Sequence, residues 1–229
     1  MDRSQYWRDY FIDRHRRVES LGKARSLDYP NDKLRFQIYA HVLEALGPLE
    51  GRDVLDVGCG WGSYALMLDA CGAIVTAVDI VPETIAKLAQ AHPNITWKVL
   101  DMSSIIELAA LPAYDRIVAT EALQHVEFGP TLSSLWQHVR PGGRLVGSMP
   151  NAGCPIIQKV MESYKGYFRG VSPVEIVHAA GTLPDLGESW IRGLQFRADQ
   201  AFLPYDATNW TREIQGRPNR LIFTLLRKE

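Results

Sequence analysis

The chain has 229 residues, 46% of them hydrophobic, and its 25 basic and 26 acidic side chains give a net charge of −1. A chain of this length can form one large domain with a sizeable core, and its balanced charge excludes the global basic field that attracts nucleic acid or anionic membranes. No apolar signal segment follows the charged start and no window approaches about 18 uncharged apolar residues, so the sequence predicts a cytoplasmic protein with no membrane partner.

The first 50 residues are predicted to be helical. Four aromatic side chains recur at i, i+1, i+4 and i+5 near the start of the chain: Tyr6, Trp7, Tyr10 and Phe11. A second helical run over residues 32–46 ends at Gly47 and Pro48, which are stop signals. After this point the sequence pattern changes from helices alone to alternating strands and helices. We therefore expect residues 1–50 to form an N-terminal helical cap, or lid, on a main domain over 51–229.

From residue 53 onward, short apolar strands alternate with helices. Strands are predicted over residues 53–57, 74–79, 95–100, 115–120, 144–149, about 189–197 and 220–227. Helices are predicted near residues 62–71, 82–91, 130–139 and 172–180. The last of them has Ser172 as N-cap and Pro173 at its first position. Such alternation predicts an α/β fold with a parallel sheet and helices on both faces. The final two strands lack an intervening helix, so we expect them to pair antiparallel.

A glycine-rich turn follows the first strand. The sequence Asp-Val-Leu-Asp-Val-Gly-Cys-Gly-Trp-Gly at residues 53–62 joins a buried strand to a helix through alternate glycines. Glycine has no Cβ and tolerates positive φ, so this turn can bring the backbone against a ligand beyond the carboxyl end of the strand. Asp79 closes the next strand 23 residues after Asp56, where one carboxylate can hold the hydroxyls of a ribose. These two features predict a cofactor that contains a nucleoside.

Three segments resemble motifs of class I S-adenosylmethionine-dependent methyltransferases. Residues 53–62 resemble motif I, an acid followed by G-x-G-x-G, and Leu100-Asp101-Met102 resembles the adenine-binding segment. Residues 114–126 resemble the segment that leads from the fourth strand into the active site. The resemblance covers roughly residues 50–150. It implies a Rossmann-like, seven-stranded, mostly parallel sheet with an antiparallel C-terminal hairpin, and an enzyme that uses S-adenosylmethionine.

The resemblance implies a cofactor site at the carboxyl ends of the first four strands. Its cofactor-binding residues are, in chain order, Asp56, Gly58, Cys59, Gly60, Asp79, Ile80, Asp101, Met102 and Glu121. Asp56 and the backbone of the glycine turn would hold the methionine end, and Asp79 would hold the ribose. Ile80 would pack on the adenine face, Asp101 would accept from the adenine amino group, and the backbone of Met102 would meet the ring.

The same resemblance places Glu121 and His125 where methyl donor and acceptor meet. Neutral His125 is suited to take a proton from a hydroxyl near pH 7, and Glu121 is expected to orient rather than to catalyse. A packing role for His125 is the alternative. We expect an oxygen or nitrogen acceptor on a small molecule, with a slight preference for oxygen because His125 could serve as the base.

The acceptor is expected to bind two segments outside the cofactor site. Aromatic side chains that could form walls for a planar molecule are Tyr6, Tyr10 and Tyr29 from the first 50 residues, and Tyr164 and Tyr167 from a lid insertion over about 151–171. The alternative is that these rings only pack the lid onto the sheet. The basic stretch Arg14-His15-Arg16-Arg17 is either a solvated helix face or a site for an anionic group on the acceptor.

Other function classes fit the sequence less well. A nicotinamide-dependent dehydrogenase should have glycine at the sixth position of its turn, where this chain has Ser63. DNA amino-methyltransferases usually have Asn/Asp-Pro-Pro-Tyr/Phe where this chain has Thr-Glu-Ala-Leu at 120–123, so no nucleic-acid partner is expected. The three cysteines have no Cys-x-x-Cys spacing, which favours a reducing compartment and no metal site. A non-catalytic S-adenosylmethionine-binding subunit stays open, as does the oligomeric state.

Overall fold

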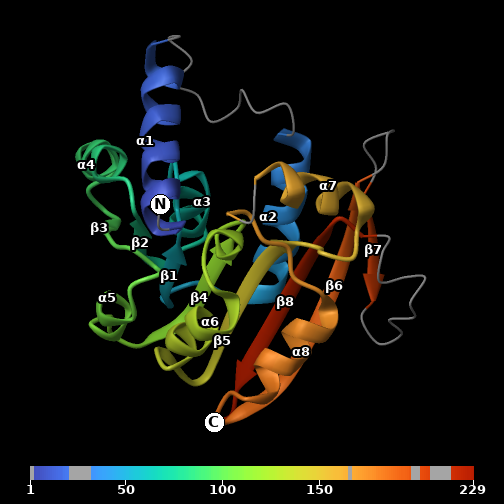
Figure 1. Ribbon diagram of the computed structural model, residues 1–229. Helices are drawn as coiled ribbons and strands as arrows, with labels where there is room; N and C mark the ends of the chain where they lie inside the picture. The colour runs from blue at the N-terminus through green and yellow to red at the C-terminus, as the bar shows by residue number, and fades with distance from the viewer. Residues whose placement is uncertain (1–2, 21–31, 165–166, 197–201, 207–217) are drawn as a thin grey trace.

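The computed structural model describes residues 3–20, 32–164, 167–196, 202–206 and 218–229, and in these residues helices cover both faces of one mixed sheet (Figure 1). The strands are β1 (Asp53–Val57), β2 (Ile74–Asp79), β3 (Thr96–Val99), β4 (Tyr114–Thr120), β5 (Val139–Pro150), β6 (Leu186–Phe196), β7 (Phe202–Asp206) and β8 (Arg220–Arg227). Their order across the sheet is β3-β2-β1-β4-β5-β8-β6-β7. The first five run parallel, and β8 is inserted antiparallel between β5 and β6. The predicted fold class is therefore confirmed.

The described residues contain one strand that the sequence did not predict. The short strand β7 pairs antiparallel with β6 and extends the sheet at its edge, so the sheet has eight strands. The segment contains Pro204, which lacks the N–H that a central strand needs and lowers the strand prediction. An edge position tolerates such a residue because one side of the strand makes no ladder.

Strand β5 begins at Val139, five residues before the predicted start at residue 144. Tyr114 of β4 pairs with Val139 of β5, and Arg116 pairs with Arg144. Four residues of β5, 140–143, therefore lie opposite a single residue of β4 and form a bulge. Gly142 has φ of 70°, and a Cβ on Gly143 would lie 2.7 Å from the carbonyl oxygen of Arg140. The glycines of this segment thus permit a bulge inside a long strand.

The described residues also contain helices, most of which cover the two faces of the sheet. They are α2 (Asp32–Leu46), α3 (Ser63–Ala70), α4 (Pro82–Ala91), α5 (Ile105–Ala109), α6 (Phe128–Trp136), α7 (Pro155–Ser163) and α8 (Pro173–Gly181), with a short 3₁₀ turn η2 (Leu123–His125). Leu55 and Ile117 pack with residues of α5, α6 and α8. Their neighbours Val54 and Val118 pack with α2, α3 and α4. Alternate strand residues point to opposite faces, so each central strand is buried on both sides.

Helix α1 (Arg3–Ser20) lies at the end of the sheet where β1 and β4 stop, whereas α2 packs on a sheet face (Figure 1). Ile38, Val42 and Leu46 of α2 are buried in the core beside β1. Asn151 and Val171, the limits of the predicted insertion, form an isolated bridge. Within the described ranges, no helix combines the length and apolar character that crossing a bilayer requires.

Candidate active site

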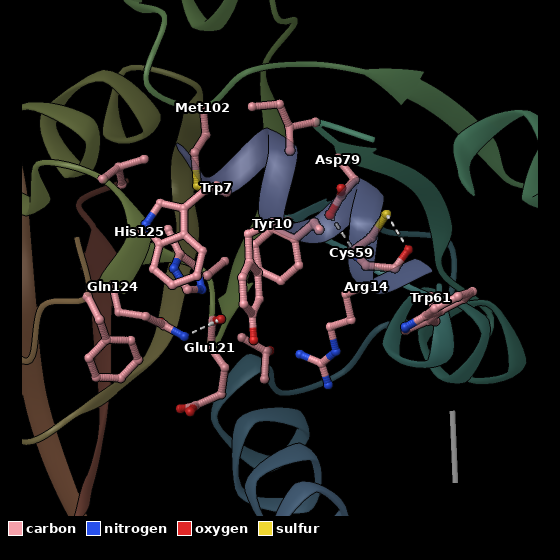
Figure 2. A pocket seen from close by; sticks show the side chains of 18 of the residues that line it. Trp7, Tyr10, Arg14, Cys59, Trp61, Asp79, Met102, Glu121, Gln124 and His125 are labelled. Carbon is pink, nitrogen blue, oxygen red and sulfur yellow. Dashed lines mark hydrogen bonds between the residues drawn. The ribbon is translucent and has the colours of Figure 1, made fainter. Parts of the chain in front are cut away.

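A cavity of about 330 Å³ lies between α1 and the carboxyl ends of β1, β2 and β4 (Figure 2). Most of the predicted site residues line it: Gly58, Cys59, Gly60, Asp79, Ile80, Asp101, Met102, Glu121, His125, Tyr10 and Tyr164. Three more described residues from the prediction, Asp56, Tyr6 and Tyr167, do not line it. Tyr29 lies outside the described residues.

The glycine turn has the left-handed backbone that its sequence predicts. Gly58, Gly60 and Gly62 have φ of 73°, 52° and 76°. A Cβ on Gly58 would lie 2.5 Å from the Cβ of Ala122, so the turn and the loop after β4 approach too closely for a side chain. A Cβ on Gly60 would meet nothing within 4 Å. The turn therefore packs tightly at its first glycine and leaves open space at its second.

Asp79 at the end of β2 fixes this turn. Its Oδ2 accepts a hydrogen bond from the Gly60 N–H at 2.9 Å, and its Oδ1 accepts one from the Val81 N–H at 3.1 Å. Burial raises the pKa of Asp79, and the backbone N–H groups of Gly60, Val81 and Ile80 oppose that rise. Each carboxylate oxygen has a second lone pair, so both can still accept from ligand hydroxyls.

Asp56 lies beneath the turn rather than in the cavity wall. Its side chain is 1% exposed, and Oδ2 has no hydrogen-bond partner among the described residues. Burial, and then the nearby charge of Asp79, raise the pKa of Asp56 to about 7. A cation placed close to a buried carboxyl of this kind stabilises its ionised form.

This raised pKa makes the stability of the unliganded protein depend on pH. Between pH 3.8 and about 7 the unfolded chain releases the Asp56 proton while the folded chain keeps it, so the free energy of unfolding should fall as pH rises through this window. Asp56→Asn cannot ionise, and its melting temperature relative to the unsubstituted protein should increase from about pH 4 to about pH 7. Thermal unfolding at several pH values, with Asp69→Asn as control, measures this. A constant difference would contradict the raised pKa.

The residues after β3 also line the cavity. The Oδ1 of Asp101 accepts from both the N–H and the Oγ of Ser103, at 2.9 and 2.7 Å. The Oδ2 lies 3.8 Å from the Arg8 guanidinium of α1. Helix α5 begins later and has Ser104 as its N-cap, so Asp101 does not cap it. Asp101 thus lines the cavity and also joins the loop after β3 to α1.

Glu121 begins the loop after β4 in a conformation that is rare for a residue with a side chain. Its φ is 52°, and Ser148 holds the backbone through a hydrogen bond from the Glu121 N–H to Oγ at 3.0 Å. The Nε of Arg220 donates to Glu121 Oε2 at 2.7 Å, and the Ser148 Oγ donates to Oε1 at 3.2 Å. Both oxygens of Glu121 are therefore engaged by neighbouring side chains, which is consistent with an orienting residue.

His125 ends the 3₁₀ turn and is surrounded by aromatic rings. The ring centroids of Trp7, Phe11 and Phe168 lie 4.0, 5.3 and 6.2 Å from that of His125. Trp7 is 3% exposed and its Nε1 donates to the Tyr167 carbonyl oxygen at 2.9 Å. Helix α1 therefore covers the His125 side of the cavity.

The two tyrosines that do not line the cavity hold α1 in place. The rings of Tyr6 and Tyr167 stack at 4.0 Å with an angle of 7° between them. Together with the Trp7 hydrogen bond, this stack joins α1 to the segment that follows α7. The contacts of Tyr6 and Tyr167 agree with the alternative given in the sequence analysis, in which these rings only pack the lid.

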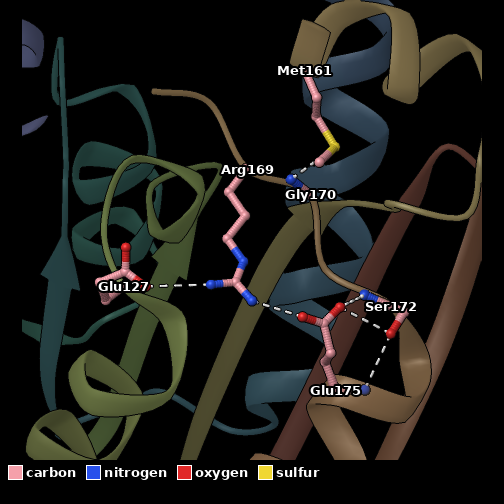
Figure 3. Close-up of polar contacts among 6 residues, drawn as sticks. All are labelled: Glu127, Met161, Arg169, Gly170, Ser172 and Glu175. Carbon is pink, nitrogen blue, oxygen red and sulfur yellow. Dashed lines mark hydrogen bonds and ion pairs between the residues drawn. The ribbon is translucent and has the colours of Figure 1, made fainter. Parts of the chain in front are cut away.

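Arg169 connects the segment that follows α7 to the loop after β4 (Figure 3). The Arg169 N–H donates to the Gln124 carbonyl oxygen at 3.0 Å. The Arg169 guanidinium pairs with Glu127 at 3.4 Å and with Glu175 at 2.7 Å. Glu175 also closes the capping box with Ser172 at the start of α8, as the sequence predicted for that N-cap. These contacts fix Phe168, the preceding residue, beside His125.

Several lining residues were not among the predicted site residues. They are Trp7, Phe11, Arg14, Ile38, Tyr39, Trp61, Ser63, Ser103, Thr120, Ala122, Gln124, Val126, Phe168 and Arg220. Trp7, Phe11 and Phe168 share the aromatic pattern by which the tyrosines were selected, so the sequence contained a signal that could have predicted them. Arg220 follows Glu121 by 99 residues and carries no local motif. In the part of the chain that the structure describes, no three His, Cys, Asp or Glu residues are grouped so that they could hold a metal ion.

Known proteins share both sequence and architecture with this chain. Residues 32–213 match the model of a family described as "Methyltransferase domain". A ubiquinone biosynthesis O-methyltransferase of Xylella fastidiosa (strain 9a5c) is 38% identical over 111 residues, which are 45% of this chain and 44% of that protein. A second, from Methylocella silvestris, is 34% identical over 153 residues, 65% of this chain and 52% of that protein. The chain thus spans about half the length of the curated relatives it matches.

A solved structure shows the same fold over the full chain. Magnesium protoporphyrin IX methyltransferase from Synechocystis PCC 6803, crystallised with bound SAH, superposes with a TM-score of 0.66 and 21% identity. The match covers 99% of this chain and 100% of that one. At this level of identity the likeness concerns the fold.

Proposed function

Since this chain belongs to the methyltransferase-domain family, we propose that it transfers a methyl group from S-adenosylmethionine to an oxygen, or alternatively a nitrogen, of a small metabolite. One observation carries the proposal. The glycine turn of β1, Asp79 after β2 and Asp101 after β3 all line a single cavity at the carboxyl end of the sheet. Family membership favours this function over the nicotinamide-dependent dehydrogenase.

The residues present fit the cofactor at each of its parts. Open space at Gly60 admits a ligand against the backbone, and the Asp79 oxygens retain capacity for ribose hydroxyls. Asp101, Ile80 and Met102 all line the cavity, where Asp101 would accept from the adenine amino group and the other two would contact the ring. The Oδ2 of Asp56, which is buried and has no hydrogen-bond partner among the described residues, would offer the methionine ammonium a negative charge.

Methyl transfer requires little of the protein beyond alignment of the methyl donor with the acceptor. S-adenosylmethionine, when bound, supplies a methyl group already activated on a sulfonium. His125 would take the proton of an acceptor hydroxyl as the new oxygen–carbon bond forms and the carbon–sulfur bond breaks. Glu121 would hold the loop that carries His125, and the residues that line the cavity would position the reactants. The names of the relatives, which are O-methyltransferases, support oxygen as the acceptor atom.

The cap of this enzyme is proposed to be α1 with the segment after α7. Trp7, Tyr10, Phe11 and Arg14 of α1 line the cavity, whereas α2 is part of the covering of the sheet. The cytoplasmic location and the absence of nucleic-acid and membrane partners stay predictions from the sequence.

Isothermal titration of the protein with S-adenosylhomocysteine and, separately, with NAD tests the cofactor. We expect the first to bind and the second not to bind. Binding of NAD without S-adenosylhomocysteine would overturn the proposal. Release of S-adenosylhomocysteine during incubation of S-adenosylmethionine with hydroxylated and amino metabolites then separates an enzyme from a non-catalytic binding subunit, for which no metabolite would give release above background.

A further inference from the structure

The antiparallel strand β8 brings its first residue to the edge of the sheet where the parallel strands end. Arg220 begins β8 and pairs with Pro150, the last residue of β5. Because β8 runs against β5, the start of β8 lies beside the carboxyl end of β5. Arg220 lines the cavity there, and its side chain is 17% exposed. A residue from near the end of the chain thus reaches the candidate active site.

Arg220 is held in one orientation and is bonded to Glu121. Its Nε donates to Glu121 Oε2 at 2.7 Å, and its Nη1 donates to the Asn219 carbonyl oxygen at 3.0 Å. The Asn219 N–H in turn donates to the Leu194 carbonyl oxygen of β6 at 3.0 Å. Glu121 balances the charge of Arg220, so the pair adds no net charge to the cavity. The contribution of Arg220 is therefore the orientation that it gives to Glu121.

Glu121 needs such support because its backbone conformation is unfavourable for a residue with a Cβ. Its φ of 52° lies in the left-handed region, which side chains other than glycine adopt uncommonly. Conformations of this kind persist where surrounding contacts hold them. Here Ser148 accepts from the Glu121 N–H and donates to Oε1, and Arg220 donates to Oε2. Together these contacts fix both the backbone and the side chain of Glu121.

A short loop carries this constraint from Glu121 to His125. The Gln124 Nε2 donates to the Glu121 carbonyl oxygen at 2.5 Å (Figure 2), and Gln124 is 5% exposed. The His125 N–H donates to the Ala122 carbonyl oxygen at 3.2 Å. Only three residues separate Glu121 from His125. The direction of the chain at Glu121 therefore decides where the His125 ring lies.

We propose that Arg220 is a positioning residue for methyl transfer, which holds Glu121 and thereby fixes the loop that carries His125 at the cavity. The inference rests on the proposed function, in which His125 faces the methyl acceptor. Arg220 acts through Glu121 and needs no contact of its own with the donor or the acceptor. Its loss should therefore reduce the rate of transfer more than the affinity for the cofactor.

Kinetics of Arg220 variants test this role. Rates are measured at saturating S-adenosylmethionine with the metabolite of the panel that is turned over fastest. Arg220→Gln should lower kcat by roughly tenfold or more, because a small misplacement of a reacting group is costly, and should change the dissociation constant of S-adenosylhomocysteine by less than about twofold. Arg220→Lys should recover most of kcat, because its ammonium can donate to Glu121. Arg192→Gln, which removes a cation paired with Glu44 outside the cavity, is the matched control.

A double variant shows whether Arg220 acts through Glu121. Glu121→Ala combined with Arg220→Gln should lower kcat no further than the more damaging of the two single variants, because residues that act as a unit are not additive. Losses that multiply would show independent roles and overturn the proposal. An unchanged kcat in Arg220→Gln would also overturn it, as would a loss of cofactor affinity equal to the loss of kcat.

Amide hydrogen exchange gives a readout that needs no methyl acceptor. In protein saturated with S-adenosylhomocysteine, Arg220→Gln should increase exchange in residues 121–126 by about tenfold, and Arg220→Lys should restore the slow exchange. A merely structural role would increase exchange throughout β5, β8 and β6 as well. Unchanged exchange in 121–126, or a general increase over these strands, would overturn the proposal.

The two proposals fail in different ways. Absence of S-adenosylhomocysteine binding to the unsubstituted protein contradicts the proposed function. Normal binding, with the exchange of residues 121–126 unaltered in Arg220→Gln, contradicts only the positioning role.

Discussion

Asp79→Ala is expected to weaken S-adenosylhomocysteine binding by roughly 1–3 kcal/mol, the cost of losing a charged hydrogen-bond partner. The change removes the proposed acceptor for the ribose hydroxyls. It also removes the hydrogen bond that the Gly60 N–H donates to Asp79 Oδ2 at 2.9 Å, so the glycine turn loses this connection to β2. Isothermal titration gives the change in dissociation constant, and circular dichroism shows that the variant is folded.

Two further variants separate these contributions. Asp79→Asn keeps an oxygen that can accept from the backbone, so it should bind more tightly than Asp79→Ala and less tightly than the unsubstituted protein. Asp69→Ala removes a carboxylate on α3 that accepts from Asn94 outside the cavity, and it should leave binding unchanged. Unchanged affinity in Asp79→Ala would remove Asp79 from the cofactor site.

His125→Ala is expected to lower kcat by about 10²-fold or more if His125 is the general base for a hydroxyl acceptor. S-adenosylhomocysteine binding should persist, because the proposed cofactor contacts are made by other residues. The rate is measured with the acceptor of the metabolite panel that is turned over fastest. A kcat close to that of the unsubstituted enzyme would reduce His125 to a packing role.

A ring of similar size distinguishes the base from a packing residue. Alanine leaves a hole beneath Trp7, whose ring centroid lies 4.0 Å from that of His125, so a loss of activity could arise from disturbed packing. His125→Phe keeps a ring there but cannot accept a proton. Equal losses in both variants support proton transfer, and recovery in the phenylalanine variant supports packing. His178→Ala, on the exposed surface of α8, is the control.

Local patterns were enough to predict most of the fold. Strands 53–57, 74–79 and 220–227 have the bounds expected from their apolar runs, and α2 and α4 begin and end where the sequence placed them. The alternation of strand and helix fixes the parallel part of the sheet, because parallel pairing needs a crossover. Edge strand β7 was missed because Pro204 lowers the strand prediction, and the bulge in β5 was missed because it depends on the register with the neighbouring strand β4.

The cofactor end of the cavity could be predicted because each of its residues follows a strand of a parallel sheet, and such positions meet at one edge. The acceptor end could not. Arg220 reaches Glu121 from an antiparallel strand 99 residues away, and no spacing in the sequence relates the two. Trp7 shares the aromatic pattern of the selected tyrosines but was outside the predicted set. Its contact with His125 depends on how α1 is placed over the sheet.

Arg8 and Tyr10 belong to the same helix but serve different parts of the site. Arg8 lies 3.8 Å from Asp101, which is assigned to the cofactor, and Tyr10 lines the cavity as a candidate contact of the acceptor. A shift of α1 that makes room for one ligand must also alter the surroundings of the other. Donor and acceptor affinities are then thermodynamically linked, and the factor by which either ligand changes the dissociation constant of its companion is the same in both directions.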